Sequence, residues 1–267
     1  MLSVQLGMIG GGVMGEALLS RLIAKQVYKP DAVLVSDPLP ARRDFLAHKY
    51  GVGVTDDNRA LAAASEVLLL AIKPQVFDAV VSSLTDVRPG QLVISILAGV
   101  PLSQLESAFG SQPAIRAMPN TPATVGAGIT AIAPGTHVQP SHLQQAKEIF
   151  QAVGEVVEVS ESLMDAVTGL SGSGPGYVAI AIEALTDGGV CAGLPRAIAY
   201  KLALQTVLGT AQLLHESGMH PAELKDRVTS PGGTTIAGIA QMERAGLRSA
   251  LIEGVVAASK RSKELGS

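Results

Sequence analysis

The sequence predicts an α/β protein whose N-terminal half contains a parallel sheet and whose C-terminal half is entirely helical. Up to about Val159, short runs of β-branched residues alternate with segments whose apolar residues recur at helical spacing, which is typical of βαβ units. After Val159 no further strand-like run occurs, and Pro and Gly take positions that suit helix starts and ends. We therefore expect two domains, residues 1–160 and residues 161–267.

The first domain is expected to consist of short apolar strands separated by helices. The strands are Val4–Ile9, Ala32–Ser36, Val67–Ile72, Leu92–Ile96 and Ala114–Met118. The helices are Val13–Ala24, Ala41–Tyr50, Val76–Leu84, Leu102–Phe109 and one around 141–153. Two further apolar runs, Ile129–Ala133 and Val156–Val159, flank the last helix and are expected to extend the sheet.

The helices of the second domain are apolar on more than one face. They are expected at Tyr177–Ala192, Pro195–Ser217 and Leu251–Ala258. A helix that is apolar all round must be buried on all sides, and this half of the chain is too short to cover three such helices alone. We therefore expect at least a homodimer.

Composition excludes several classes of partner. Hydrophobic residues make up 47% of the chain and charged residues 16%, with a net charge of −3, so neither a nucleic-acid footprint nor a polybasic membrane patch is expected. Cys191 is the only cysteine, which suits a reducing compartment. No apolar run approaches the roughly 18 residues of a membrane helix, and the first residues lead directly into a strand. We expect a cytoplasmic protein.

A glycine pattern follows the first expected strand. In "LGMIGGGVMGEALLSRL", Gly10, Gly12 and Gly15 are spaced as in the G-x-G-x-x-G turn of a Rossmann-type dinucleotide-binding domain. There the first glycine forms the turn, the second lets the backbone approach a pyrophosphate, and the third allows strand and helix to pack closely. The pyrophosphate would lie at the N-terminus of the helix. The pattern predicts a bound dinucleotide.

The end of the second strand leaves the choice of cofactor open. Asp37 stands where an acidic side chain can accept hydrogen bonds from the adenosine ribose of NADH. Arg42 and Arg43 follow closely and could instead hold the 2′-phosphate of NADPH. We expect NADPH or NADH as the cofactor.

Three further strand ends are expected to border the nicotinamide. The stretches "AIKPQ" (Ala71–Gln75), "SILAG" (Ser95–Gly99) and "MPNTP" (Met118–Pro122) each carry a turn former at the carboxyl end of a strand. Ligands of open α/β sheets bind at these ends. Lys73 is the one charged side chain among the three stretches.

The stretch "TSPGGTT" predicts a small carboxylate site in the helical half. Pro231 cannot continue the preceding helix, Gly232 and Gly233 turn the chain, and Thr234 and Thr235 begin the next helix. Several backbone N–H groups therefore converge beside a hydroxyl, which favours an anion. A plain helix–turn–helix corner with a threonine cap is the alternative.

These stretches together resemble the Δ1-pyrroline-5-carboxylate reductases, which catalyse the last step of proline synthesis. The resemblance covers nearly the whole chain, through "IGGGVMG", "AIKPQ", "SILAG", "RAMPNTPA", "GLSGSGPGY", "EALTDGGVCAGLPR" and "HPAELKDRVTSPGGTTIAGIAQME". It implies hydride transfer from NADPH or NADH to a cyclic imine, giving L-proline. It also implies interlocked homodimers and sometimes larger rings of dimers.

The resemblance also implies site residues. The cofactor would contact Ile9, Gly10, Gly11, Gly12, Val13, Met14, Ser36, Asn58, Ala71, Ile72, Lys73, Pro74, Leu97, Ala98 and Gly99, in addition to Asp37, which is expected from its place after the second strand. The substrate carboxylate would contact Ser230, Gly232, Gly233, Thr234 and Thr235, and the Thr235 hydroxyl would bind the ring nitrogen as the catalytic group. Two departures from the family occur, Gly176 in place of an Ala and Asp37–Pro38 in place of an Asn-Arg pair.

The residues around the two C-terminal loops fit reduction of an imine. Neither the glycine-rich loop Gly169–Tyr177 nor the loop Thr229–Thr235 offers a His or Lys, which alcohol oxidation needs as a general base. A protonated C=N bond needs no such base, because it is already electrophilic. His215 and His220 lie five residues apart across a glycine, so no metal site is expected. Two alternatives remain. A β-hydroxyacid dehydrogenase-like enzyme would need a lysine after the glycine-rich loop, where the next one is Lys201; a dinucleotide-binding sensor would have no turnover.

Overall fold

The computed structural model describes residues 4–84 and 87–266, which form two compact units. One unit contains the described residues up to Ser173 together with those from Ala257 onward. The other unit is Gly174–Val256. The expected α/β class with a helical C-terminal half is confirmed. The exact domain boundary near residue 160 stays a prediction.

The first unit is built on a sheet whose eight strands, in the described residues, follow the order β3-β2-β1-β4-β5-β6-β7-β8. The strands are β1 (Val4–Ile9), β2 (Val33–Ser36), β3 (Gly53–Thr55), β4 (Ser65–Leu70), β5 (Leu92–Ser95), β6 (Ala114–Met118), β7 (Gly128–Pro134) and β8 (Gly154–Glu158). Neighbouring strands are parallel except β6 and β7, which pair antiparallel. The order reverses beside β1, which is where such sheets bind ligands.

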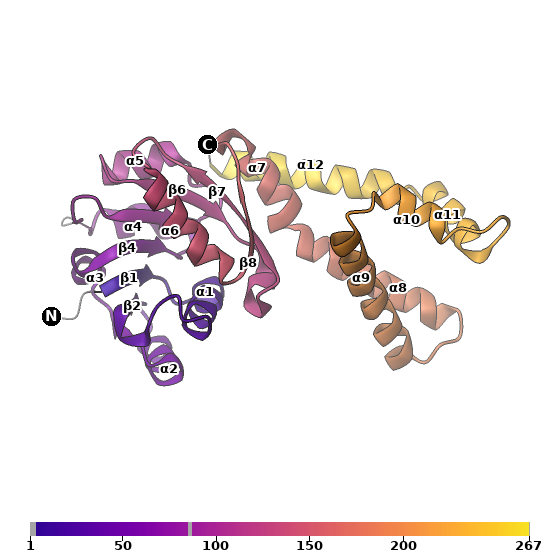
Figure 1. Cartoon of the computed structure of the whole chain (residues 1–267), viewed down its shortest axis with the longest axis horizontal. Coiled ribbons are helices and arrows are strands. Elements are labelled where there is room, and N and C mark those ends of the chain that lie inside the picture. The colour runs from indigo at the N-terminus through magenta and orange to yellow at the C-terminus, as the bar shows by residue number, and fades with distance from the viewer. Residues whose placement is uncertain (1–3, 85–86, 267) are drawn as a thin grey trace. The chain divides into compact units, whose positions relative to one another are not determined.

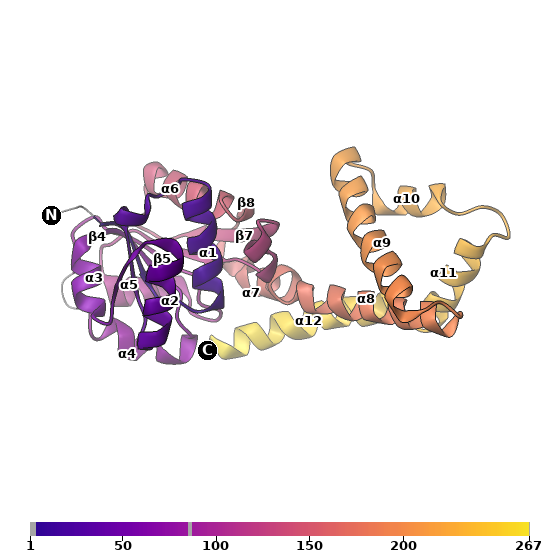
Figure 2. The same cartoon turned by 90° about the horizontal axis from the view of Figure 1, so that it is seen from below.

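Helices cover both faces of this sheet (Figures 1 and 2). One face is covered by α1 (Val13–Ala24), α2 (Pro40–Tyr50) and α6 (Pro140–Gln151), the other by α3 (Asn58–Ala64), α4 (Phe77–Val81) and α5 (Leu102–Phe109). Strand β4 shows the period of two that this arrangement requires. Its Val67 and Leu69 belong to the first apolar core, and its Leu68 and Leu70 to the second. All four side chains are fully buried.

Most expected elements lie where the sequence placed them, and α1 and β6 have the expected bounds. Among the strands and α-helices, β3, α3 and the four-residue helix α7 (Met164–Val167) were missed. Strand β3 has three residues, none of them buried, and α3 is a short alanine-rich turn that begins after its cap Asp57. The expected helix Val76–Leu84 is instead a 3₁₀ turn, η2 (Pro74–Val76), followed by α4.

The second unit contains α8 (Gly174–Cys191), α9 (Arg196–Ser217), α10 (Pro221–Arg227) and α11 (Thr234–Arg244). The last helix, α12 (Leu247–Leu265), begins in this unit and ends in the first. Gly193 and Gly218 follow the ends of α8 and α9 with φ of +99° and +62°, so the expected helix ends are confirmed. None of the helices in the described part of the chain combines the length and apolar character that crossing a bilayer requires.

The second unit has almost no core of its own. Within Gly174–Val256, Thr186, Ala199 and Ala203 are the buried residues. Large apolar side chains are exposed instead, for example Ile198 at 51%, Leu202 at 54% and Leu208 at 56% on α9. Such faces exceed what a lone soluble unit normally leaves in contact with water.

Candidate functional site

The first unit contains a cleft of about 560 Å³ at the carboxyl ends of β1, β2 and β4. Most of its lining consists of residues expected to bind the cofactor: Ile9, Gly10, Gly12, Ser36, Asp37, Asn58, Ala71, Ile72 and Lys73. The cleft lies beside the point where the strand order reverses, and its volume suits part of an extended ligand.

The glycine turn has the geometry that a pyrophosphate requires. Gly10 has φ of +103°, and a Cβ there would lie 2.5 Å from the carbonyl oxygen of Ala71. A Cβ on Gly15 would collide with the carbonyl oxygen of Gly10, so α1 packs closely on β1. At Gly12 a Cβ would meet no atom within 4 Å and would instead enter the open cleft. The three glycines therefore fit a dinucleotide, with Gly12 keeping the approach to the backbone free.

The N-terminus of α1 is open to an anion. Its N-cap is Gly12, and no side chain caps it. The first N–H groups of a helix have no acceptor within the helix, and the helix dipole adds partial positive charge. Val13 is exposed in this first turn, while Met14 packs against the core. The N–H groups of this turn can thus bind phosphate oxygens.

Hydrogen bonds fix the polar side chains at the end of β2. The Ser36 hydroxyl donates to Oδ1 of Asn58 over 2.5 Å. The Asp37 carboxylate accepts from the N–H of Gly11 through Oδ2 and from the N–H of Leu39 through Oδ1, each over 3.0 Å. Gly11 is therefore buried beneath the cleft, beside Asp37, and does not line it.

Seven of the expected cofactor residues lie outside the lining of this cleft: Gly11, Val13 and Met14 around the start of α1, and Pro74, Leu97, Ala98 and Gly99. Pro74 begins η2 next to Lys73, and the Leu97–Gly99 turn follows β5. Leu97 is buried, and Gly99 has φ of +79°. Gly99 packs tightly against the last residues of the chain, since a Cβ on Gly266 would lie 2.5 Å from its carbonyl oxygen.

Sequence reasoning missed several residues that line the cleft. They are Pro38, Leu39, Asp56, Val76 and Val80. Asp56 directly follows β3, so recognising that short strand would have placed its carboxylate at the same sheet edge as Asp37.

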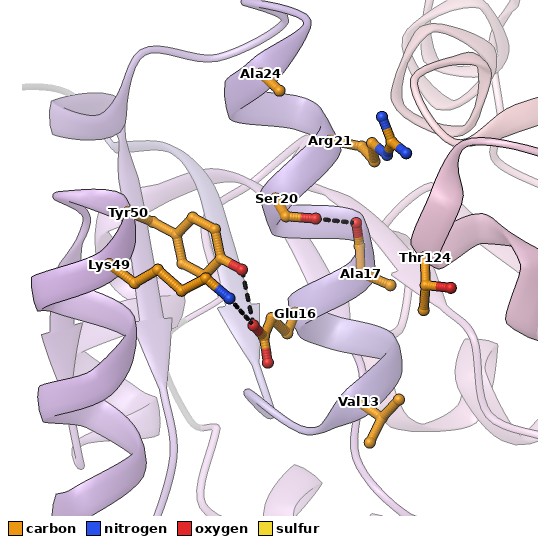
Figure 3. A pocket seen from close by; sticks show the side chains of 9 residues that line it. All are labelled: Val13, Glu16, Ala17, Ser20, Arg21, Ala24, Lys49, Tyr50 and Thr124. Atoms are coloured by element: carbon orange, nitrogen blue, oxygen red, sulfur yellow. Dashed lines mark hydrogen bonds and ion pairs between the residues drawn. The ribbon is translucent and has the colours of Figure 1, made fainter.

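A second pocket, of about 570 Å³, runs along the outer face of α1 (Figure 3). In it the Glu16 carboxylate accepts from Nζ of Lys49 over 3.0 Å and from the hydroxyl of Tyr50 over 2.7 Å. Arg42 donates to the same carboxylate over 2.5 Å. Burial raises the pKa of Glu16, but the hydrogen bonds from Arg42, Tyr50 and Lys49 outweigh it and lower the pKa to about 2. Glu16 is thus a stable anion that holds two cations of α2.

The residues at the end of β6 contact the run of small residues that begins at Gly169. The Asn120 amide donates to the carbonyl oxygen of Ser171 over 3.2 Å and accepts from the N–H of Ile129 over 3.0 Å. Ser171 belongs to the π-helix η5 (Thr168–Gly172). π-Helices are rare in proteins, and those that occur are often found at functional sites. A Cβ on Gly172 would lie 2.8 Å from the methyl group of Met118. The small residues here let β6 and η5 approach closely.

The 230–235 loop joins α10 to α11 in the second unit. Gly232 has φ of +67°, and the N–H of Gly233 donates to the carbonyl oxygen of Ser230 over 3.0 Å. Thr234 begins α11, as the sequence predicts, but the N-cap is Gly233 and no side chain caps the helix. The threonine cap of the plain-corner alternative is therefore wrong. The open first turn, with half-buried Thr235 in it, can bind a carboxylate.

His220 caps α10, where its Nδ1 accepts from the N–H of Ala222 over 3.2 Å, and His215 is on α9. Among the described residues, no three His, Cys, Asp or Glu side chains gather as a group able to hold a metal ion.

Comparison with known proteins shows similarity along the whole chain. Residues 161–265 match the family model for pyrroline-5-carboxylate reductase dimerisation, and residues 5–99 match that for NADP oxidoreductase, coenzyme F420-dependent. A pyrroline-5-carboxylate reductase of Synechocystis is 63% identical over 265 residues, which cover 99% of each chain.

Solved structures show the same similarity. A pyrroline-5-carboxylate reductase of Coxiella burnetii superposes with a TM-score of 0.93 at 37% identity, covering 99% of both chains. A pyrroline carboxylate reductase of Plasmodium falciparum with NADP bound superposes with a TM-score of 0.90 at 30% identity, covering 100% of both chains.

Proposed function

The chain belongs to the pyrroline-5-carboxylate reductase family and has the NAD(P)H-dependent reductase activity of that family, and we propose which of its residues bind cofactor and substrate. The cofactor occupies the cleft at β1, β2 and β4, with its pyrophosphate on the first turn of α1. The open glycine turn at Gly10 and Gly12 is the observation that carries this assignment. Of the functions left open by the sequence, the family assignment favours the reductase.

The 230–235 loop binds the substrate. The N–H groups at the uncapped start of α11 donate to the carboxylate of pyrroline-5-carboxylate, and Gly232 gives the loop its left-handed turn. The Thr235 hydroxyl lies in the same helical turn and hydrogen-bonds the ring nitrogen. Contacts to both the carboxylate and the ring nitrogen fix the position of the imine carbon that receives the hydride.

For this reaction the main task of the protein is to position the substrate. When bound, NADH or NADPH would supply a hydride to the carbon of the protonated C=N bond, which becomes C5 of proline. The electron pair of that bond then moves onto nitrogen, and the product is the secondary amine of proline. Thr235 orients the nitrogen during this step, and no general base is needed.

Two copies of the chain form the working enzyme. The exposed apolar side chains of α9 and the nearly core-less unit Gly174–Val256 support a homodimer, as does the dimerisation model that matches residues 161–265. The 230–235 loop of one subunit holds the substrate beside the nicotinamide that is bound by the other subunit. The dimers assemble further into rings. The single cysteine supports a cytoplasmic location.

A spectrophotometric assay tests the activity. Purified protein with pyrroline-5-carboxylate should consume NADH or NADPH, and proline should accumulate in equal amount. Folded protein that oxidises neither cofactor in the presence of substrate would exclude the reductase function.

A further inference from the structure

Two carboxylates, Asp37 and Asp56, line the cofactor cleft beside the ends of β2 and β3, and Asp56 is paired with Arg43. Arg42 and Arg43, which could hold a 2′-phosphate, do not line it. The structure thus helps to decide between the two interpretations that the sequence leaves open, because it shows which side chains line the cleft.

Asp37 is held in one orientation. Its two carboxylate oxygens accept from the N–H groups of Gly11 and Leu39, each over 3.0 Å, and the residue is 9% exposed. Each oxygen has a second lone pair, so the carboxylate can still accept from ribose hydroxyls. It cannot easily turn away from a phosphate, since that would leave two backbone donors without an acceptor.

The side chain of Arg42 binds residues that do not line the cleft. Its NH2 group lies 2.5 Å from the Glu16 carboxylate, and its Nε donates to the carbonyl oxygen of Gly11 over 2.5 Å. Its guanidinium also lies over the ring of Phe45, 5.0 Å from the centroid. To reach a 2′-phosphate, Arg42 would have to give up an ion pair, a hydrogen bond and a cation–π contact.

Arg43 is engaged beneath the β2–α2 connection. Its NH1 group donates to the carbonyl oxygens of Asp37 over 2.7 Å and Pro38 over 3.2 Å. Its NH2 group pairs with Asp56 over 3.3 Å, so the charge nearest the cleft is already balanced. Arg43 therefore supports the backbone that positions Asp37.

We propose that Asp37 makes this reductase selective for NADH over NADPH. Its carboxylate accepts from the adenosine ribose hydroxyls of NADH and repels the additional phosphate of NADPH, for which neither arginine is free. The inference rests on the cofactor site proposed above.

Calorimetric titration of the whole protein with NADH and with NADPH, without substrate, tests the proposal. The wild type should bind NADH at least roughly tenfold more tightly than NADPH. In Asp37→Asn the ratio of the two dissociation constants should fall at least roughly fivefold, because the repulsive charge is gone while one oxygen remains as an acceptor. Asp44→Asn removes an exposed carboxylate from α2, the helix that follows Asp37, at a position outside the cleft, and should leave the ratio unchanged.

Each other result has a defined meaning. Equal affinity of the wild type for both cofactors, or a preference for NADPH, would overturn the inference and leave the reductase function intact. An unchanged ratio in folded Asp37→Asn would remove Asp37 as its cause. If that variant does not fold, titration of the wild type with adenosine 2′,5′-bisphosphate and with AMP decides, since AMP should bind more tightly. Failure of both dinucleotides to bind would overturn the cofactor site itself.

Discussion

Glu16 in the first turns of α1 and Arg42 near the start of α2 form an ion pair of 2.5 Å. Lys49 and Tyr50, from the last turn of α2, bind the same carboxylate. One anion therefore joins both ends of α2 to the helix that carries the cofactor turn.

This cluster predicts an acid-sensitive contribution to stability. The pKa of Glu16 is lowered to about 2 from 4.5, so its contribution is complete above about pH 4.5 and is lost as the pH falls towards 2. Glu16→Gln should lower the free energy of unfolding at pH 7 by roughly 1–2 kcal/mol, less than the full shift because water screens the cluster. Urea unfolding at several pH values should show the difference from wild type shrinking below pH 4.5. In Asp44→Asn no comparable difference is expected, and a constant gap for Glu16→Gln down to pH 3 would contradict the prediction.

The glycine turn predicts two different results for the same small substitution. Gly12→Ala meets open space, so it should leave the free energy of unfolding unchanged and weaken cofactor binding by roughly tenfold, because the new methyl group enters the pyrophosphate position. Gly15→Ala collides with the carbonyl oxygen of Gly10 and should cost roughly 1–3 kcal/mol of stability. Chemical denaturation and calorimetric titration measure the two effects. Tight cofactor binding by Gly12→Ala would place the pyrophosphate elsewhere.

Thr235 is expected to act on turnover and not on the cofactor. Thr235→Ala should lower kcat/KM by roughly tenfold to a thousandfold, as the loss of ~1.4 to 4 kcal/mol of transition-state binding implies. The dissociation constant for NADH should hardly change. Thr235→Ser keeps the hydroxyl and serves as the matched variant, with most of the activity expected. Wild-type kinetics in Thr235→Ala would remove this hydroxyl from the mechanism.

The proposed dimer predicts complementation between two inactive subunits. A Gly12→Asp subunit, unable to bind cofactor, and a Thr235→Ala subunit should regain activity when they are unfolded and refolded together, because one composite site in each heterodimer is intact. Light scattering should report at least a dimer at micromolar concentration. A fully active monomer would overturn the dimer, whereas a dimer without complementation would place each site within one chain.

The sequence predicts the elements that have a strong local signal and misses those that depend on distant neighbours. Helix α1 has its expected bounds because a glycine turn starts it and apolar residues repeat at helical spacing. Strand β3 lacks buried side chains, so it has no apolar run to detect. The antiparallel direction of β7 leaves no trace in its composition, which resembles that of the parallel strands.

The candidate site also combines features that the sequence predicts with features that depend on distant neighbours. The glycine pattern and Asp37 identify most of the cleft from the sequence. The roles of Arg42 and Arg43 do not follow from spacing, because their partners Glu16 and Asp56 come from other elements and compete with any ligand for them. Only coordinates show that both guanidinium groups are already engaged.

The return of α12 to the first unit has a consequence for the order of biosynthesis. Ser262 is buried near the end of this helix and donates to Asp165 over 2.7 Å, and Asp165 also lies 4.0 Å from Arg116 of β6. A ribosome translates all eight strands of the sheet well before it reaches Ser262. During synthesis, Asp165 therefore lacks this partner until helices α8 to α11 have also emerged from the ribosome. Completion of the cofactor-binding unit is thus one of the last events of synthesis, although its sequence is nearly the first to be read.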